Sequence, residues 1–143
     1  MATITADLKD GYAVELRDGT HVWYADEPEE HGGTDTGPTP YELLLSAAAA
    51  CTCITISMYC RRKDWDLHSI SARYEHDKVH ADDCEDCESD VSGYIDRVRS
   101  EIYIEGEFDQ EQRERLTSIA SKCPVRKSLA KGAEFTTETV FVG

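Results

Sequence analysis

The alternation of apolar and polar residues predicts β-strands in the first part of the chain. We expect strands over Ala2–Asp7, Tyr12–Arg17 and Thr20–Asp26, and the alternation is clear in the second and third. Asp18-Gly19 lies between these two strands and is typical of a tight hairpin turn. Residues 26–39 are rich in Gly, Pro and acidic residues and are expected to form a loop. A loop of this length in a compact domain is more often functional than idle.

A long apolar run from Gly37 to Lys63 predicts one helix. Thr39 fits its N-cap, Pro40 its first position, and Glu42 its third position, where it closes a capping box. The helix is apolar on nearly all sides, so we expect it to be buried on nearly all sides. Serines and threonines interrupt the run, which argues against a membrane span. We therefore expect a central core helix.

The second half of the chain predicts more strands and a second helix. Leu67–Val79 and Ile95–Phe108 alternate clearly, Asp109 is suited to cap a helix, and Glu134–Val142 is expected as a closing strand. Strands in runs, interrupted by two helices, favour an α+β fold with mostly antiparallel sheet.

Length, cysteine content and net charge indicate how many domains the chain has, in which cellular compartment it works and which partners it disfavours. A chain of 143 residues predicts a single domain, residues 1–143. The first ten residues do not resemble a leader segment, so we expect a cytoplasmic protein whose six cysteines are reduced. With 15 basic against 29 acidic residues, the net charge of −14 disfavours nucleic acid and anionic membranes as partners.

Two cysteines, Cys51 and Cys123, lie on apolar helical stripes and are the first candidates for chemistry. Burial raises the pKa of a thiol, so a cation or a hydrogen-bond donor must activate it. Cys51 is too far along its helix to use the N-terminus, whereas Cys123 would cap a short helix that begins at Pro124. Alternatively, both are small buried hydrophobes. Cys53 and Cys60 share one helix face and are expected to pack.

A second group combines two imidazoles with two thiols. His76, His80, Cys84 and Cys87 are spaced closely enough for a zinc site. The surrounding segment DDCEDCESD is so acidic that it is equally typical of a solvated tip. A disulfide between the two cysteines and an idle thiol pair are further alternatives. Zinc is therefore one expectation for this segment.

Three stretches together resemble the OsmC/Ohr family of thiol peroxidases. They are DEPEEHGGTDTGPTPYELLLSAAAACT, RRKDWDL and EQRERLTSIASKCPV, and they occur in order over nearly the whole chain. The resemblance implies an OsmC-like α+β fold with antiparallel sheets around long central helices, formed by an intertwined homodimer with active sites at its interface. It also implies reduction of organic hydroperoxides without flavin or haem.

The resemblance assigns roles to four residues. Cys51 matches the peroxidatic cysteine and Cys123 the resolving cysteine, which a dithiol, of lipoyl type or another, would then reduce. Glu42 resembles the family's acid that pairs with an arginine. It stands nine residues before Cys51, one fewer than in the Ohr and OsmC branches, so it is equally a capping residue. Arg17 is the candidate arginine, with an exposed strand arginine as the alternative.

An alternative function from another class is compatible with the same fold. In it, the chain is a non-catalytic domain that binds a small molecule or an acyl group, the apolar helix lines the pocket, and the cysteines are inert.

Overall fold

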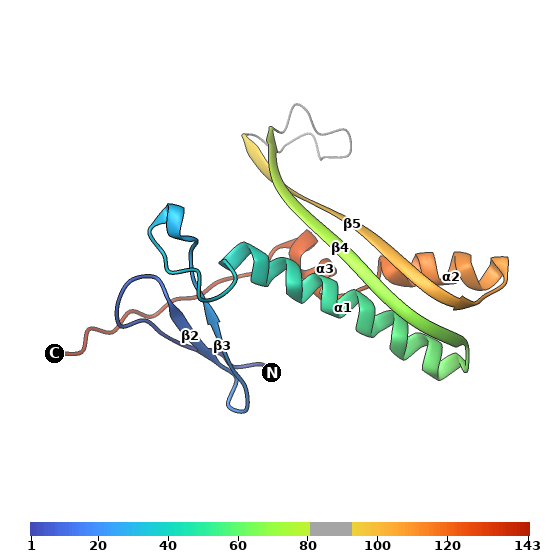
Figure 1. Cartoon of the computed structure of the whole chain (residues 1–143), viewed down its shortest axis with the longest axis horizontal. Coiled ribbons are helices and arrows are strands. Elements are labelled where there is room, and N and C mark those ends of the chain that lie inside the picture. Colours follow the sequence, from blue (N-terminus) through green and yellow to red (C-terminus); the bar gives the residue numbers. More distant parts are fainter. Residues whose placement is uncertain (81–92) are drawn as a thin grey trace. The chain divides into compact units, whose positions relative to one another are not determined.

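A computed structural model describes residues 1–80 and 93–143 of the chain. It combines helices with antiparallel sheet, which confirms the predicted α+β class. The elements are β1 (Thr5–Asp7), β2 (Val14–Arg17), β3 (Val22–Ala25), the 3₁₀ helix η1 (Glu29–His31), α1 (Pro40–Lys63), β4 (Asp66–His80), β5 (Tyr94–Glu107), α2 (Gln110–Ala120) and α3 (Pro124–Lys131) (Figure 1).

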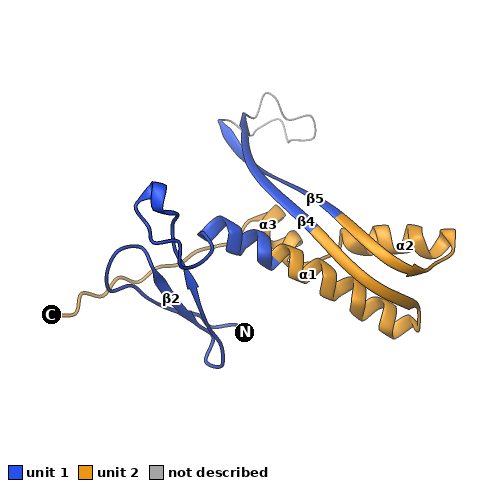
Figure 2. Ribbon diagram, in the orientation of Figure 1, with its two compact units in different colours: residues 1–47, 73–101 blue, residues 48–72, 102–143 orange. Residues whose placement is uncertain are grey.

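The chain divides into two compact units (Figure 2). Unit 1 comprises residues 1–47 and 73–101, and unit 2 comprises residues 48–72 and 102–143. Helix α1 and strands β4 and β5 each contribute residues to both units. A single domain over residues 1–143 stays a prediction.

Unit 1 contains the predicted N-terminal sheet, in the order β1-β2-β3. Both pairings are antiparallel, and Glu15 of β2 lies opposite Tyr24 of β3. The hairpin between these strands turns at Asp18-Gly19, where Gly19 adopts a φ of 97°. The Asp18 carboxylate accepts a hydrogen bond from the backbone amide of Thr20 at 2.9 Å. The strands are shorter than predicted, but the three strand segments and the turn are confirmed.

The loop that leads from β3 into α1 is organised by the buried carboxylate of Asp26. Asp26 is 2% exposed and accepts hydrogen bonds from the hydroxyls of Thr34 and Thr36 at 2.6 and 2.7 Å. Backbone amides of the same loop add further bonds. Gly33 and Gly37 allow two backbone segments of this region to approach each other closely. A Cβ atom at Gly33 would lie 1.9 Å from a backbone carbonyl oxygen, and one at Gly37 would lie 2.3 Å from another. Hydrogen bonds of the hydroxyls lower the pKa of Asp26 well below its usual range.

Unit 2 contains a hydrophobic core between α1 and α2. Ile56, Tyr59 and Cys60 of α1 pack with Leu116 and Ile119 of α2, and each of these side chains is at most 7% exposed. Partly buried residues of β4, β5, α2 and the connections surround the cluster: Trp65, Leu67, Ile70, Ile102, Ile104, Phe108 and Ala120. The apolar stripes of the two predicted helices therefore face each other.

The expectation that α1 is buried on nearly all sides is wrong for the single chain. The buried residues of α1 follow one face, from Ala48 to Cys60. On other faces, Ile54 is 57% and Met58 is 66% exposed. By length and composition alone the helix could cross a membrane, a test that core helices also pass.

Strands β4 and β5 form a long two-stranded sheet (Figure 1). Side chains bond across it: Ser69 donates to Glu105 at 3.1 Å, and Arg97 donates to Asp77. The partner numbers fall along one strand as they rise along the other, as antiparallel strands require. The two strands confirm the predicted segments to within one residue at each end.

The predicted closing strand over Glu134–Val142 is wrong for the single chain. Residues 132–143 carry no strand or helix, and Phe135, Phe141 and Val142 are 89%, 92% and 94% exposed. A strand forms only where a neighbouring strand satisfies its backbone groups, and the described part of this chain provides none for this segment.

Replacing Leu116 by alanine is expected to destabilise the protein by about 2–5 kcal/mol, because a fully buried side chain is lost and a cavity is left. Urea unfolding followed by circular dichroism measures the change. Leu129→Ala is the control, since Leu129 is 45% exposed and its truncation should cost much less. Equal losses for the two variants would contradict the assignment of the core.

Replacing Asp26 by asparagine is expected to lower the urea midpoint at pH 7, because the amide group faces hydrogen-bond donors. The lowered pKa of Asp26 means that its carboxylate stabilises the fold above about pH 4. The difference from wild type should persist at pH 5 and shrink as the pH falls further. The control is Asp35→Asn, at an exposed position with a φ of 51° that asparagine tolerates. A difference that did not depend on pH would contradict this role.

Candidate active site

The structure brings Cys51 and Cys123 together in unit 2. Cys51 lies in the middle of α1, and Cys123 follows α2 immediately before α3. Both are free thiols, and each contributes to the pKa shift of the other, so the two side chains are neighbours.

Cys123 is the N-cap of α3, as the sequence predicts. Pro124 occupies the first turn of the helix, and the backbone amide of Arg126 donates to the Cys123 Sγ at 3.5 Å. The side chain of Cys123 is fully buried. When protonated, its thiol donates to the backbone oxygen of Ala48 at 3.9 Å.

Hydrogen bonds make Cys123 the more acidic of the two thiols. Burial by itself would raise the pKa of Cys123. The Cys51 thiol and the Arg126 amide outweigh burial, and smaller contributions come from the Thr52 hydroxyl and the Val125 amide. The pKa of Cys123 is thereby lowered.

The environment of Cys51 has the opposite effect on its thiol. Burial, together with the hydrogen bond to Cys123, raises the pKa of Cys51, and the amide of Val125 offsets only part of this. The hydroxyl of Thr55 lies 4.0 Å from the Cys51 sulfur. Cys51 is nevertheless only partly buried, whereas Cys123 is fully buried. Cys51 is therefore the more accessible of the two residues in the single chain.

Arg17 belongs to unit 1, where it lies on β2. Its guanidinium forms an ion pair with Glu15 of the same strand, and the Arg17 side chain is 53% exposed. The hydrogen bond from Arg17 is the main cause of the lowered pKa of Glu15. Activation of Cys51 by Arg17 stays a prediction.

Glu42 closes the predicted capping box of α1. Its carboxylate accepts a hydrogen bond from the Thr39 amide at 2.9 Å, and the Glu42 amide donates to the Thr39 hydroxyl at 3.3 Å. These contacts account for the position of Glu42 in the first turn. A catalytic role for this residue stays a prediction.

The predicted zinc segment is only partly described. His76 stacks on Tyr41 with ring centroids 4.5 Å apart and bonds Asp96 at 2.8 Å, and His80 lies edge-on to Tyr94. Within residues 1–80 and 93–143, no group of three or more His, Cys, Asp or Glu is arranged to hold a metal. The other two predicted ligands, Cys84 and Cys87, lie outside the described residues. Zinc at this segment stays a prediction.

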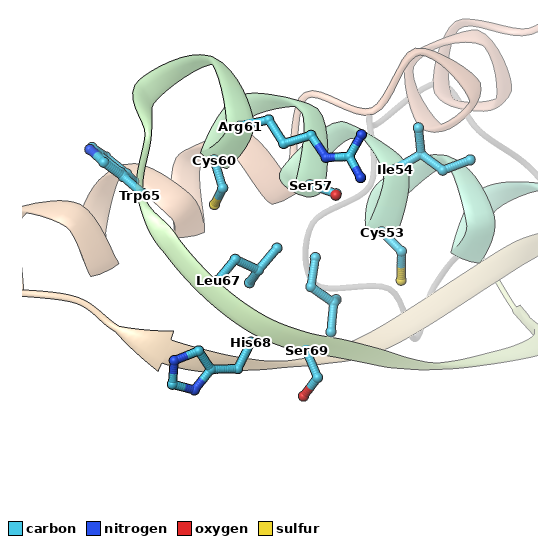
Figure 3. A pocket seen from close by; sticks show the side chains of 10 residues that line it. Cys53, Ile54, Ser57, Cys60, Arg61, Trp65, Leu67, His68 and Ser69 are labelled. Atoms are coloured by element: carbon cyan, nitrogen blue, oxygen red, sulfur yellow. The ribbon is translucent and has the colours of Figure 1, made fainter.

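Cys53 and Cys60 line a pocket between α1 and β4, apart from the Cys51–Cys123 pair. Figure 3 shows both side chains directed from α1 toward β4. The pocket has a volume of about 460 Å³. Its lining is Cys53, Ile54, Ser57, Cys60, Arg61, Trp65, Leu67, His68, Ser69 and Ile70. Burial raises the pKa of Cys60, which is 1% exposed and packs in the core as predicted.

Sequence reasoning missed Thr52 as a site residue. Thr52 is 1% exposed, and its hydroxyl is hydrogen-bonded to Cys123. A threonine at the buried face of an otherwise apolar helix was the available signal, because a buried hydroxyl needs a partner. The partner itself follows only from how α1 and α2 pack.

Comparisons with known proteins give one family and a set of solved structures. The sequence model of the family described as OsmC-like protein matches residues 33–138. An OsmC-like protein from Mycoplasma pneumoniae is 18% identical, with 91% of this chain and 87% of that chain covered and a TM-score of 0.70. An organic hydroperoxide resistance protein from Legionella pneumophila is 22% identical, with 90% and 88% covered and a TM-score of 0.63.

The organic hydroperoxide resistance protein OhrB of Bacillus subtilis is a further neighbour, at 20% identity. The alignment covers 90% of this chain and 89% of that chain, with a TM-score of 0.58. None of the curated proteins compared with the sequence matches it. At these identities the solved structures establish the fold.

Two substitutions at Glu42 separate capping from catalysis. Glu42→Gln keeps an oxygen that can accept the Thr39 amide, so stability should stay near wild type. Glu42→Ala loses this bond and is expected to cost about 1 kcal/mol in urea unfolding. If the box is the whole role of Glu42, the glutamine variant also keeps the reactivity toward hydroperoxide that the resemblance implies. A glutamine variant that is stable but unreactive would contradict this.

Proposed function

Because the chain belongs to the OsmC-like protein family, we propose that it reduces organic hydroperoxides through a two-cysteine mechanism, with Cys51 as the peroxidatic and Cys123 as the resolving cysteine. The family includes proteins named for organic hydroperoxide resistance, which links it to redox chemistry. The observation that carries the proposal for this chain is that the two thiols are neighbours in unit 2 and each affects the pKa of the other. The unequal exposure of the two thiols supports this choice of roles.

The reaction consists of three balanced steps. The Cys51 thiolate attacks the terminal oxygen of R–O–O–H, the O–O bond breaks, and the products are a Cys51 sulfenic acid and an alkoxide that takes up a proton. The Cys123 thiolate then attacks the sulfenic sulfur and displaces hydroxide, which becomes water, so a disulfide forms. A dithiol, of lipoyl type or another, reduces this disulfide by exchange and is itself oxidised. No flavin, haem or metal takes part in these steps.

The active form in this proposal is a homodimer in the cytoplasm. Ile54 and Met58 leave an apolar face of α1 exposed in the single chain, and exposed apolar patches of this kind are typical of interaction surfaces. The C-terminal segment adds Phe135 and Phe141, each about nine-tenths exposed, in a stretch whose residues alternate like those of a strand. A second copy would cover the apolar face and could supply the strand partner. A reducing compartment suits the free thiols.

The pocket between α1 and β4 favours one rival, a non-catalytic small-molecule or acyl-binding domain. Ile54, Trp65 and Leu67 give the pocket apolar walls, and Arg61 and His68 lie beside them. Binding pockets commonly combine an apolar lining with a few polar groups. In this rival the two site thiols are inert: no disulfide forms between Cys51 and Cys123, and alkylating reagents react slowly with both.

Replacing Cys51 by serine is expected to abolish hydroperoxide reduction, because serine cannot form the sulfenic acid or the disulfide. The assay mixes pre-reduced protein with cumene hydroperoxide and measures residual peroxide and free thiols. Cys53→Ser is the matched control, since Cys53 lies on the same helix and lines the pocket; it should keep the wild-type rate. Consumption of peroxide by Cys51→Ser at the wild-type rate would overturn the mechanism.

A further inference from the structure

Three cationic side chains gather around the ring of Tyr59 in unit 2. The guanidinium carbons of Arg62 and Arg115 lie 5.2 and 5.5 Å from the ring centroid, and the Lys63 Nζ lies 5.9 Å from it. Arg62 and Lys63 belong to the last turn of α1, whereas Arg115 comes from α2. Each cation is attracted to the ring, but the three like charges repel one another. An anion bound among them would offset that repulsion.

These three cations are not balanced by carboxylates in the described part of the chain. None of the ion pairs shown there includes Arg62, Lys63 or Arg115, although the chain has 29 acidic against 15 basic residues. Glu111 precedes Arg115 by four residues on α2, a spacing that favours an ion pair. The Arg115 Nε instead donates to the hydroxyl of Tyr59 at 2.9 Å. Arg115 is thus held toward the ring, and its Nη donors are left for a ligand.

Tyr59 adds a buried donor of its own. The residue is 7% exposed, and its oxygen accepts the hydrogen bond from Arg115. Within residues 1–80 and 93–143, the structure shows no acceptor for the hydrogen of this hydroxyl. The Arg115 hydrogen bond, together with the charges of Arg115, Lys63 and Arg62, lowers the pKa of Tyr59, although burial opposes this. The phenol therefore lies in a field that attracts anions.

A pocket of about 710 Å³ lies beside these groups, within unit 2. Tyr59, Lys63, Trp65 and Arg115 are among its lining residues. Trp65 packs edge-on against Tyr59, with ring centroids 5.4 Å apart, so aromatic surface lies next to the donors. The lining also includes the acidic residues Asp109, Glu111 and Glu114. They repel a doubly charged anion more strongly than a singly charged one, which favours a carboxylate over a phosphate.

We propose that this pocket binds a small organic carboxylate, whose oxygens contact the Arg115 guanidinium, the Lys63 ammonium and the Tyr59 hydroxyl. The planar fork of a guanidinium matches the two oxygens of a carboxylate, and Trp65 offers a surface for the apolar part of the ligand. Cys51 precedes Tyr59 by eight residues on α1, which is about 12 Å along the helix axis. The pocket is therefore a second site, and the inference goes beyond the proposed function without depending on it.

The binding test uses the intact, reduced protein with Trp23→Phe, so that Trp65 is its one tryptophan. Benzoate is the probe, benzamide is its uncharged isostere, and inorganic phosphate is the anion without an apolar part. We expect benzoate to quench Trp65 fluorescence and to bind at least about tenfold more tightly than either of the others, because benzamide lacks the charge-assisted hydrogen bonds. Calorimetry on the wild type should give the same ranking. Equal binding of benzamide, equal or tighter binding of phosphate, or no saturable binding of benzoate would overturn the proposal.

Neutral substitutions locate the bound carboxylate. Arg115→Gln should weaken benzoate binding by at least about tenfold. Lys63→Gln and Tyr59→Phe should each weaken it less, since one donor is lost and the ring of Tyr59 is kept. Arg113→Gln is the matched control, because Arg113 is an exposed arginine of α2 that does not line the pocket; it should bind as the wild type does. Equal affinities of Arg115→Gln and Arg113→Gln would overturn the proposal.

These titrations contain no peroxide, so their outcome is separate from that of the proposed function. Cys51→Ser, which should fail to reduce hydroperoxide, should bind benzoate with the wild-type affinity. Loss of benzoate binding in Cys51→Ser would place the ligand at the candidate active site and would overturn the assignment of a second site.

Discussion

The sulfur cap of helix α3 is the contact on which the candidate site depends. A proline in the first turn starts α3, and the residue before it must turn out of α2 to cap the helix. The packing of Leu116 and Ile119 of α2 against α1 fixes where that turn lies. Cys123 is carried in this way to the middle of α1, where Cys51 and Thr52 are located. The placement of the two cysteines is thus a consequence of core packing and helix capping.

The two thiols differ because burial and hydrogen bonding act on them in different proportions. A shift of one pKa unit corresponds to about 1.4 kcal/mol, which is close to the net contribution of one hydrogen bond. One or two additional donors therefore suffice to decide which sulfur of a neighbouring pair is charged. Cys123 has these donors, whereas Cys51 is the residue that is more exposed to solvent.

Local signals in the sequence were enough to predict most of the fold. The capping box of α1, the hairpin at Asp18-Gly19 and the cap at Cys123 each depend on neighbouring residues, and the structure confirms them. The contact between Thr52 and Cys123 depends on how α1 and α2 pack, which spacing along the chain does not determine. The predicted strand over Glu134–Val142 requires a neighbouring strand that the described part of this chain does not offer.

The most direct test of the account is to map disulfides after reduced wild-type protein is treated with one equivalent of cumene hydroperoxide. Digestion without reduction, followed by mass spectrometry, identifies which cysteine peptides are joined. The account predicts that the peptides containing Cys51 and Cys123 are linked in nearly all of the oxidised protein. Consumption of the hydroperoxide with both of these cysteines left as free thiols would contradict it.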